Sequence, residues 1–302
     1  MLRLSVPPGR RLEDAEAFDV HIGGSEANVA YAAARVGLQA AWVSALPDNV
    51  LGRRVARTLA AGGVDTSLVR WEKPGRLGLF FLERGAAPRP TEVLYDRAGS
   101  AMALVSADAF DLDALADTRF LHVSGITLAL SDSSRELARR AMQHAKRRGA
   151  SVSMDVNYRQ RLWSRQAAAE AVREVAPMVD VLVCTAEDGR DLFQEERAAE
   201  LGAALGVDTV VVTLGAAGAV AAHGGRTVRR EGHVVETVDR IGAGDAFTAG
   251  LLWGLLDGSL ELGLERGLAM SALKMTVHGD LFTLDADDVT ALLAKDRREV
   301  GR

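Results

Sequence analysis

The chain has 302 residues, 48% of them hydrophobic, and a formal net charge of -5 at pH 7. This length and composition suffice for one large α/β domain or two smaller ones. The acidic balance gives no support to binding of nucleic acid or a membrane surface. The single cysteine, Cys184, excludes an internal disulfide and fits a reducing compartment. Because no apolar run reaches about 18 residues and the N-terminus lacks a signal-peptide core, we expect a cytoplasmic protein.

The N-terminal third alternates segments of strand and helix character. Strands are predicted at residues 18–22, 41–45, 65–71, 77–83 and 92–96, and helices at 28–38 and 49–62. Strands 77–83 and 92–96 flank the Pro/Gly-rich segment 85–90, which predicts a hairpin. Together with strand 18–22, this hairpin predicts a small β lid built from about residues 3–22 and 75–100.

The rest of the chain continues the alternation. Strands are predicted at residues 120–124, 151–156, 180–184, 209–214 and 234–238, and helices at 133–148, 246–256, 261–276 and 285–293. Strands that alternate with helices of this length indicate βαβ units and a parallel sheet. The sequence therefore predicts the α/β class.

A glycine-rich turn stands out between the predicted strand 234–238 and the apolar helix 246–256. Gly242, Ala243 and Gly244 precede the helix, whose first N–H groups lack partners and attract anions. Small residues let a phosphate approach those N–H groups closely. Asp245 follows in the first helical turn, where it could be a general base or an ordinary acidic residue at a helix N-terminus. The spacing alone leaves both alternatives open.

Two signatures resemble those of the ribokinase-like (PfkB) carbohydrate kinases. DRIGAGDAF at residues 239–247 resembles the C-terminal signature, and GGSEANVA at residues 23–30 resembles the N-terminal one. The resemblance extends over nearly the whole chain. It implies one ribokinase-like domain over residues 1–302, a three-layer α/β fold with a mostly parallel sheet, helices on both faces and the small β lid.

The resemblance also implies a transferase reaction. The γ-phosphoryl group of ATP, with Mg²⁺ on its phosphates, would pass to a primary hydroxyl of a sugar or sugar acid. Asp245 would be the base, and the N–H groups of Gly242, Ala243 and Gly244 would form the anion hole. The Gly24 backbone and the Asn28 side chain would contact substrate hydroxyls, although a tightly packed helix cap also explains these two residues.

Residues of the lid bear on the choice of substrate. Tyr95 and Arg97 lie two residues apart, so they share a face of the predicted strand. An aromatic ring and a cation suit a sugar acid, because Arg grips carboxylates well; a solvated lid edge is the alternative. Phe80 stands where some relatives have a substrate-contacting tyrosine.

A polar segment follows the predicted strand 151–156, at the kind of strand end where open α/β sheets bind ligands. DVNYRQRLW at residues 155–163 is similar to the segment of 2-keto-3-deoxygluconate kinases and fructokinases, whose arginine, here Arg159, reaches between sugar and nucleotide. Asn157 is expected near the nucleotide. Glu26 in the N-terminal signature also matches the 2-keto-3-deoxygluconate kinases. We therefore rank 2-keto-3-deoxygluconate first, and fructose or another ketose second.

Two further segments concern nucleotide and metal. TLGAAG at residues 213–218 resembles the ATP-phosphate loop, although its composition equally predicts a hairpin. The nucleotide-binding candidates there are Thr213, Gly215, Ala216, Ala217 and Gly218. Residues 185–188 replace the usual Asn-x-x-Glu but keep negative charge, so Glu187 and Asp188 are candidate metal ligands. In relatives, adenine and a monovalent cation sit near the segment that corresponds to residues 278–280.

Three expectations concern the protein as a whole. In the family the first strand begins several residues before the position of Met1, so we expect the natural chain to start further upstream. The lid of relatives often contributes to a dimer, so a homo-oligomer is expected, with neither nucleic acid nor membrane as a partner. A hypothesis of another class is a non-catalytic sugar-binding or nucleotide-binding protein on the same fold.

Overall fold

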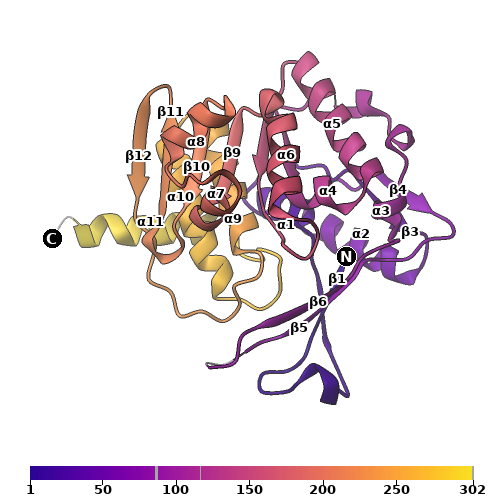
Figure 1. Cartoon of the computed structure of the whole chain (residues 1–302). Coiled ribbons are helices and arrows are strands. Elements are labelled where there is room, and N and C mark those ends of the chain that lie inside the picture. The colour runs from indigo at the N-terminus through magenta and orange to yellow at the C-terminus, as the bar shows by residue number, and fades with distance from the viewer. Residues whose placement is uncertain (86–87, 116, 301–302) are drawn as a thin grey trace.

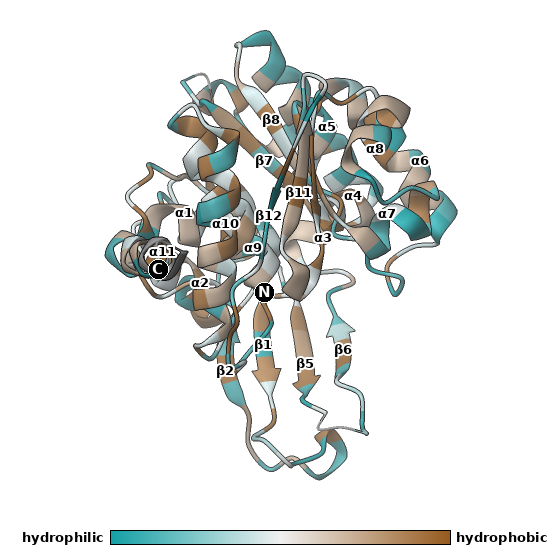
Figure 2. Ribbon diagram, turned by 90° about the vertical axis from the view of Figure 1, so that its left-hand side faces the viewer, coloured by the Kyte–Doolittle hydropathy of each residue, from teal (hydrophilic) through white to brown (hydrophobic). Residues whose placement is uncertain are grey.

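The computed structural model describes residues 1–85, 88–115 and 117–300. Figure 1 shows a body of strands and helices from which a small sheet projects. The view in Figure 2, turned by 90°, shows the four strands of this lid below the body. Within the described residues, no helix is both long and apolar enough to cross a membrane.

The body is built on a six-stranded sheet in the order β12-β11-β10-β9-β8-β7. Its strands are β7 (Phe120–Ser124), β8 (Ser151–Asp155), β9 (Val181–Thr185), β10 (Thr209–Thr213), β11 (Ala219–His223) and β12 (Arg226–Arg230). Strands β7 to β10 pair in parallel, whereas β11 and β12 add an antiparallel edge. A separate parallel pair joins β3 (Ser44–Pro47) to β4 (Val69–Glu72). The mostly parallel sheet predicted from the sequence is confirmed.

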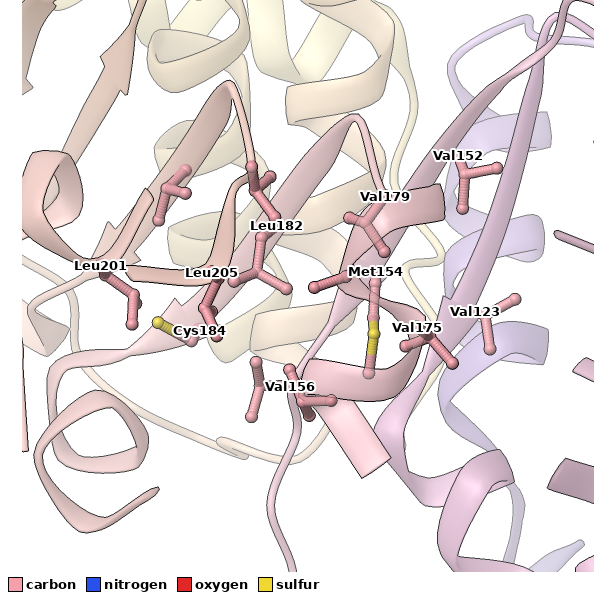
Figure 3. Packing of buried hydrophobic residues seen from close by; sticks show 14 of the residues in the cluster. Val123, Val152, Met154, Val156, Val175, Val179, Leu182, Cys184, Leu201 and Leu205 are labelled. Atoms are coloured by element: carbon pink, nitrogen blue, oxygen red, sulfur yellow. The ribbon is translucent and has the colours of Figure 1, made fainter. Parts of the chain in front are cut away.

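Alternate side chains of the central strands enter two different cores. Leu182 and Cys184 of β9 pack under the helices on one face, shown in Figure 3, whereas Val181 and Val183 pack against Phe247 on the other. The first face carries α5 (Asp132–Arg147), α6 (Arg165–Val175), α7 (Ala186–Phe193) and α8 (Ala198–Leu205). The second carries α9 (Ala243–Leu256) and α10 (Leu260–Met275), against which α1 (Ser25–Arg35) and α11 (Ala286–Val300) pack. Strands buried on both faces explain their nearly continuous apolar sequence.

The shorter helices complete the body. They are α2 (Val50–Ala61), α3 (Ala101–Leu104) and α4 (Gly125–Leu130). Asn49 caps α2, because its side chain accepts hydrogen bonds from the backbone N–H groups of Leu51 and Gly52. Helix α4 begins directly after β7, so this strand leads into the region where the body meets the lid.

The lid is a four-stranded sheet in the order β2-β1-β5-β6. Its strands are β1 (Leu2–Ser5), β2 (Asp19–Ile22), β5 (Leu79–Glu83) and β6 (Glu92–Asp96). The predicted lid is therefore confirmed, with β1 paired in parallel with β5 and antiparallel with β2. Of the predicted turn 85–90, residues 86–87 lie outside the described residues.

Several predicted boundaries are wrong in informative ways. Residues 234–238 form no strand; the N–H of Val238 instead donates to the carbonyl oxygen of Met275 at the end of α10. The strand predicted at 41–45 is shifted to β3. Helix α1 begins at Ser25 and α9 at Ala243, each three residues before its prediction, because in both cases a glycine with positive φ precedes the helix. As a result, Asn28 and Asp245 both lie within or next to a first helical turn.

Candidate active site

A cavity of about 1280 Å³ lies where the lid meets the carboxyl ends of β8 and β9. It brings together most of the site residues predicted from distant parts of the sequence. The lid and α1 contribute Gly24, Asn28, Phe80, Tyr95 and Arg97, and the body contributes Asp155, Asn157, Arg159, Thr185, Asp188, Gly242, Gly244 and Asp245. This is the position that open α/β sheets use for ligands.

The N-terminus of α9 opens into this cavity. Gly242 is the N-cap residue, with φ of 85°, and no side chain caps the helix. A Cβ on Gly242 would lie 2.0 Å from the carbonyl oxygen of Asp280, so only glycine fits there. A Cβ on Gly244 would meet no atom within 4 Å. One glycine therefore lets the turn pack against the chain behind it, and the other leaves open space in front of the helix N-terminus, where an anion is stabilised.

The carboxylate of Asp245 is held by two side chains of α1. Its two oxygens accept hydrogen bonds of 2.7 Å, one from the hydroxyl of Ser25 and one from the amide of Asn28. Burial raises the pKa of Asp245, whereas the hydrogen bonds from Asn28 and Ser25 oppose this rise. The carboxylate is thus fixed in direction and faces the cavity beside the open helix N-terminus.

A second carboxyl group, that of Asp155, lies near the carboxylate of Asp245. Asn157, at φ of 43°, donates from its side chain to the Ser25 hydroxyl over 3.0 Å, and its backbone N–H donates to Asp155 over 3.1 Å. The pKa of Asp155 is raised to about 8, first by burial and then by the charges of Asp245 and Asp188. Three carboxyl groups therefore crowd one side of the cavity, and each makes ionisation of its neighbours harder.

The sequence prediction missed Ser25 and Asp155 as site residues. Both lie inside motifs that were recognised, Ser25 within GGSEAN and Asp155 at the start of DVNYR. Ser25 contacts Asp245 only through the fold, across 220 positions of sequence. Glu26, which the signature singles out, joins two elements: its carboxylate accepts hydrogen bonds from the backbone N–H and hydroxyl of Ser124 and from the hydroxyl of Thr127. It ties α1 to the end of β7.

The lid contributes a cation, Arg97, to the same cavity. The guanidinium carbon of Arg97 lies 4.0 Å from the centre of the Tyr95 ring, which confirms that these two side chains share a face. Arg97 is only 7% exposed, and its Nε and Nη2 atoms have no hydrogen-bond partner among the described residues. Burial and the charge of Arg159 lower the pKa of Arg97. Buried, unpaired donors beside a second cation fit an anionic group that has yet to bind.

Two further predictions concern the nucleotide loop and the metal ligands. The segment 213–218 is the loop of an antiparallel hairpin between β10 and β11, and its residues are not among those that line the cavity. Of the two metal candidates, Asp188 lines the cavity, whereas Glu187 is exposed and does not. Thr185 caps α7 through a 2.9 Å bond from the Asp188 N–H to its hydroxyl. Among the described residues no three His, Cys, Asp or Glu side chains form a metal cluster on their own.

The fold and the site define a sugar kinase of the ribokinase-like class. A family model described as pfkB family carbohydrate kinase matches residues 4–287, so the chain belongs to this family. It is a phosphotransferase with an alcohol group as acceptor.

Individual relatives are similar over almost the whole length. The chain is 42% identical over 299 residues to the 2-dehydro-3-deoxygalactonokinase of Haloferax volcanii, which covers 97% of this chain and 94% of the relative. It is 35% identical over 270 residues to the 2-dehydro-3-deoxygluconokinase of Thermoproteus tenax, covering 87% and 82%. The crystal structure of 2-dehydro-3-deoxygluconokinase from Thermotoga maritima superposes with a TM-score of 0.90 at 34% identity, covering 97% and 95%.

Proposed function

We propose that this protein is an ATP-dependent kinase of a six-carbon 2-keto-3-deoxy sugar acid, with Asp245 as the general base. The observation that carries the proposal is the pairing of opposite chemistries across one cavity. Arg97 offers unpaired N–H donors for a carboxylate, and Asp245 stands at the open N-terminus of α9. A neutral sugar would offer Arg97 only uncharged oxygens, which pair with a buried guanidinium more weakly than a carboxylate does.

The proton transfer rests on the arrangement around Asp245. In the proposed reaction, ionised Asp245 takes the proton of the primary hydroxyl while that oxygen attacks the γ-phosphorus of ATP and ADP leaves. Ser25 and Asn28 hold the carboxylate in one orientation. The N–H of Ala243 already donates to the backbone carbonyl oxygen of Arg240, so Gly242 and Gly244 are the proposed anion-hole donors. Their N–H groups would stabilise negative charge on the transferred group without reorganisation.

The residues present fit a magnesium ion shared with phosphates. Asp155 and Asp188 face the cavity, and burial is the main cause that raises the pKa of both; the charge of Asp188 adds to the rise at Asp155, and that of Glu187 to the rise at Asp188. A divalent cation relieves such repulsion, and Mg²⁺ is commonly held by one or two carboxylates plus substrate phosphates. When bound, it would neutralise charge on the phosphates. Asp188 remains a proposed ligand, and Asp155 joins it.

Which of two epimeric 2-keto-3-deoxy acids is the substrate is a finer question. The sequence motifs rank 2-keto-3-deoxygluconate first, whereas the 42% identical relative is named for the galactonate epimer. The two acids share the carboxylate that Arg97 would bind, so we propose the class and keep 2-keto-3-deoxygalactonate as the second candidate. Fructose comes after both, because it lacks the carboxylate.

The test is an ADP-release assay with Mg-ATP. The acceptors are both epimeric acids, fructose, ribose and adenosine, each titrated to give kcat/KM. We expect kcat/KM for at least one of the acids to exceed that for fructose by about 10²-fold, the scale for leaving a buried charged donor unpaired. Equal values for acid and fructose would contradict carboxylate recognition. Binding of acid or ATP without turnover of any acceptor would favour the non-catalytic alternative.

A further inference from the structure

A lysine with no contact to water lies behind the glycine turn. Lys274, in the last turn of α10, is 0% exposed. Its Nζ atom donates to two backbone carbonyl oxygens, those of Asp239 and Val277, each at 3.3 Å. Lysines are almost never fully buried unless they are paired. A lysine near a helix C-terminus is common, but this one reaches beyond its own helix to the segment that leads into the anion-binding turn.

The surroundings of Lys274 form a closed group of charges. The carboxylate of Asp239 accepts hydrogen bonds from Arg3, Arg84 and the backbone N–H of Gly279. Arg3 is itself 0% exposed and also donates to Asp280 over 2.8 Å. Burial lowers the pKa of Lys274, the carboxylates of Asp239 and Asp280 oppose this, and the two arginines reinforce it. Two arginines therefore pair with the buried carboxylates, while Lys274 lies beside them and binds backbone carbonyl oxygens.

This charge group is attached directly to the glycine turn that lines the cavity. The carboxylate of Asp239 accepts a 3.2 Å hydrogen bond from the N–H of Ile241, and the N–H of Ala243 donates to the backbone carbonyl oxygen of Arg240 over 3.2 Å. Gly242 packs against the carbonyl of Asp280 so closely that no side chain fits. The positions of residues 239 and 280 thus fix the position of the helix N-terminus beside Asp245.

The resemblance to ribokinase-like kinases implies a monovalent cation near residues 278–280, and the residues present do not fit one. Potassium binds where backbone carbonyl oxygens replace its hydration shell. Here the carbonyl oxygens of Asp239 and Val277 already accept from the amino group of Lys274. Arg3 and Arg84 lie on the adjacent carboxylate, so a further cation would meet repulsion.

We infer that Lys274 takes the place of a monovalent cation: its amino group holds the Asp239 and Val277 carbonyls together, positions the 239–244 turn and makes the reaction independent of K⁺ and Na⁺. This inference rests on the proposed kinase function. Lys274 is a positioning residue, because it contacts the support of the turn and not the reacting atoms.

The test compares salts at equal ionic strength, with choline chloride replacing KCl. The wild-type protein is expected to show the same kcat in both salts within about twofold, since ionic strength is held constant. Lys274→Ala is expected to lose about 10²-fold in kcat in choline chloride, the scale for a misplaced catalytic geometry. Because the substitution also opens space beside two carbonyls, KCl should restore part of that loss. Lys146→Ala is the matched control: Lys146 also ends a helix but lies on the surface in a pair with Asp180.

Each outcome of this comparison either supports or overturns the inference about Lys274. A wild-type rate that KCl raises several-fold would overturn the inference, as would a Lys274→Ala protein with an unchanged rate in choline chloride. A defect that KCl relieves no better than choline chloride would make Lys274 a packing residue only and would also overturn it. If the alanine variant does not fold, Lys274→Met keeps the apolar stem without the N–H donors, and the wild-type salt comparison still applies.

A second readout separates this inference from the kinase proposal. The thermal unfolding midpoint of the ligand-free wild type is expected to be equal in KCl and choline chloride, and a midpoint raised by KCl alone would show a filled cation site. If no acceptor is phosphorylated in either salt, the kinase proposal fails, and this midpoint alone decides whether Lys274 has replaced the cation.

Discussion

The two sides of the cavity differ in what they leave unsatisfied. On the lid side, Arg97 stacks on Tyr95 with unpaired N–H donors, and a second cation, Arg159, lies close enough to lower its pKa. On the body side, Asp155 and Asp188 have raised pKa values because they are buried near like charges. The lid side of the cavity therefore presents positive charge, and the body side presents carboxyl groups. In the proposed reaction, a sugar carboxylate would pair with the lid side, and magnesium with the ATP phosphates would pair with the body side. The lid would then select the substrate, and the body would carry out the phosphoryl transfer.

The largest expected effect is on the body side. Asp245→Asn keeps the shape of the side chain but removes the base, so kcat should fall by roughly 10²- to 10⁴-fold. The KM for the sugar acid should stay within a few-fold if chemistry is slower than substrate release, because Asn can still contact Ser25 and the hydroxyl. Steady-state kinetics measure both. An unchanged kcat would remove Asp245 from the mechanism.

The next effect belongs to the lid. Arg97→Ala should lower kcat/KM for the sugar acid by about 10- to 10²-fold, because a carboxylate would be left without its partner. The residual activity on fructose should change only a few-fold. Arg89→Ala is a matched control on the same lid, since Arg89 pairs with Glu83 and does not line the cavity. Equal losses on acid and fructose would show that Arg97 supports the lid and does not select the substrate.

A smaller effect is expected from changing Ser25, the α1 residue whose hydroxyl donates to Asp245. Ser25→Ala removes one of the two donors to Asp245 and the acceptor for Asn157. We expect kcat to fall about tenfold, the worth of one hydrogen bond to a charged group. Loss of that donor should also raise the pKa of Asp245, so the acidic limb of the kcat–pH profile should move to higher pH. A rate loss without that movement would point to disturbed packing of α1.

The last prediction concerns stability and not the reaction rate. The pKa of Asp155 rises from 3.8 to about 8 on folding, so protonated Asp155 contributes stability that is complete below pH 3.8 and lost as pH rises through 8. Between pH 5 and 9 the ligand-free wild type should lose thermal midpoint relative to Asp155→Asn, by roughly 2–4 °C per kcal/mol for a chain of this size. Scanning calorimetry of the two proteins across this range checks the slope. Parallel curves would mean that Asp155 ionises normally.

The sequence predicted several residues that the structure brings together, because the signals for these residues are local. The glycine turn, the GGSEAN segment and the pairing of Tyr95 with Arg97 depend on residues close in sequence, and the structure brings all three into one cavity. Strand and helix existence was predicted for most of the body for the same reason. The starts of α1 and α9 were predicted three residues late. Each helix follows an N-cap glycine with positive φ, Gly24 or Gly242, and a pattern of apolar residues does not reveal such a cap.

What could not be predicted depends on tertiary contact. Val234 and Val238 have strand character, yet the segment follows the end of α10 through a hydrogen bond to Met275. The link from Ser25 to Asp245 and the burial of Lys274 are also set by segments far apart in the chain. Local propensity carries no information about partners that are distant in sequence. For this reason, the sequence alone does not single out Ser25 or Lys274.

Phosphorus NMR of a reaction with Mg-ATP and either epimeric acid tests the central claim most directly. We predict one new phosphate-monoester signal, coupled to the protons of the primary carbon and equimolar with the ADP formed. Release of inorganic phosphate in place of that signal, or a monoester formed as readily from fructose as from either acid, would contradict the account.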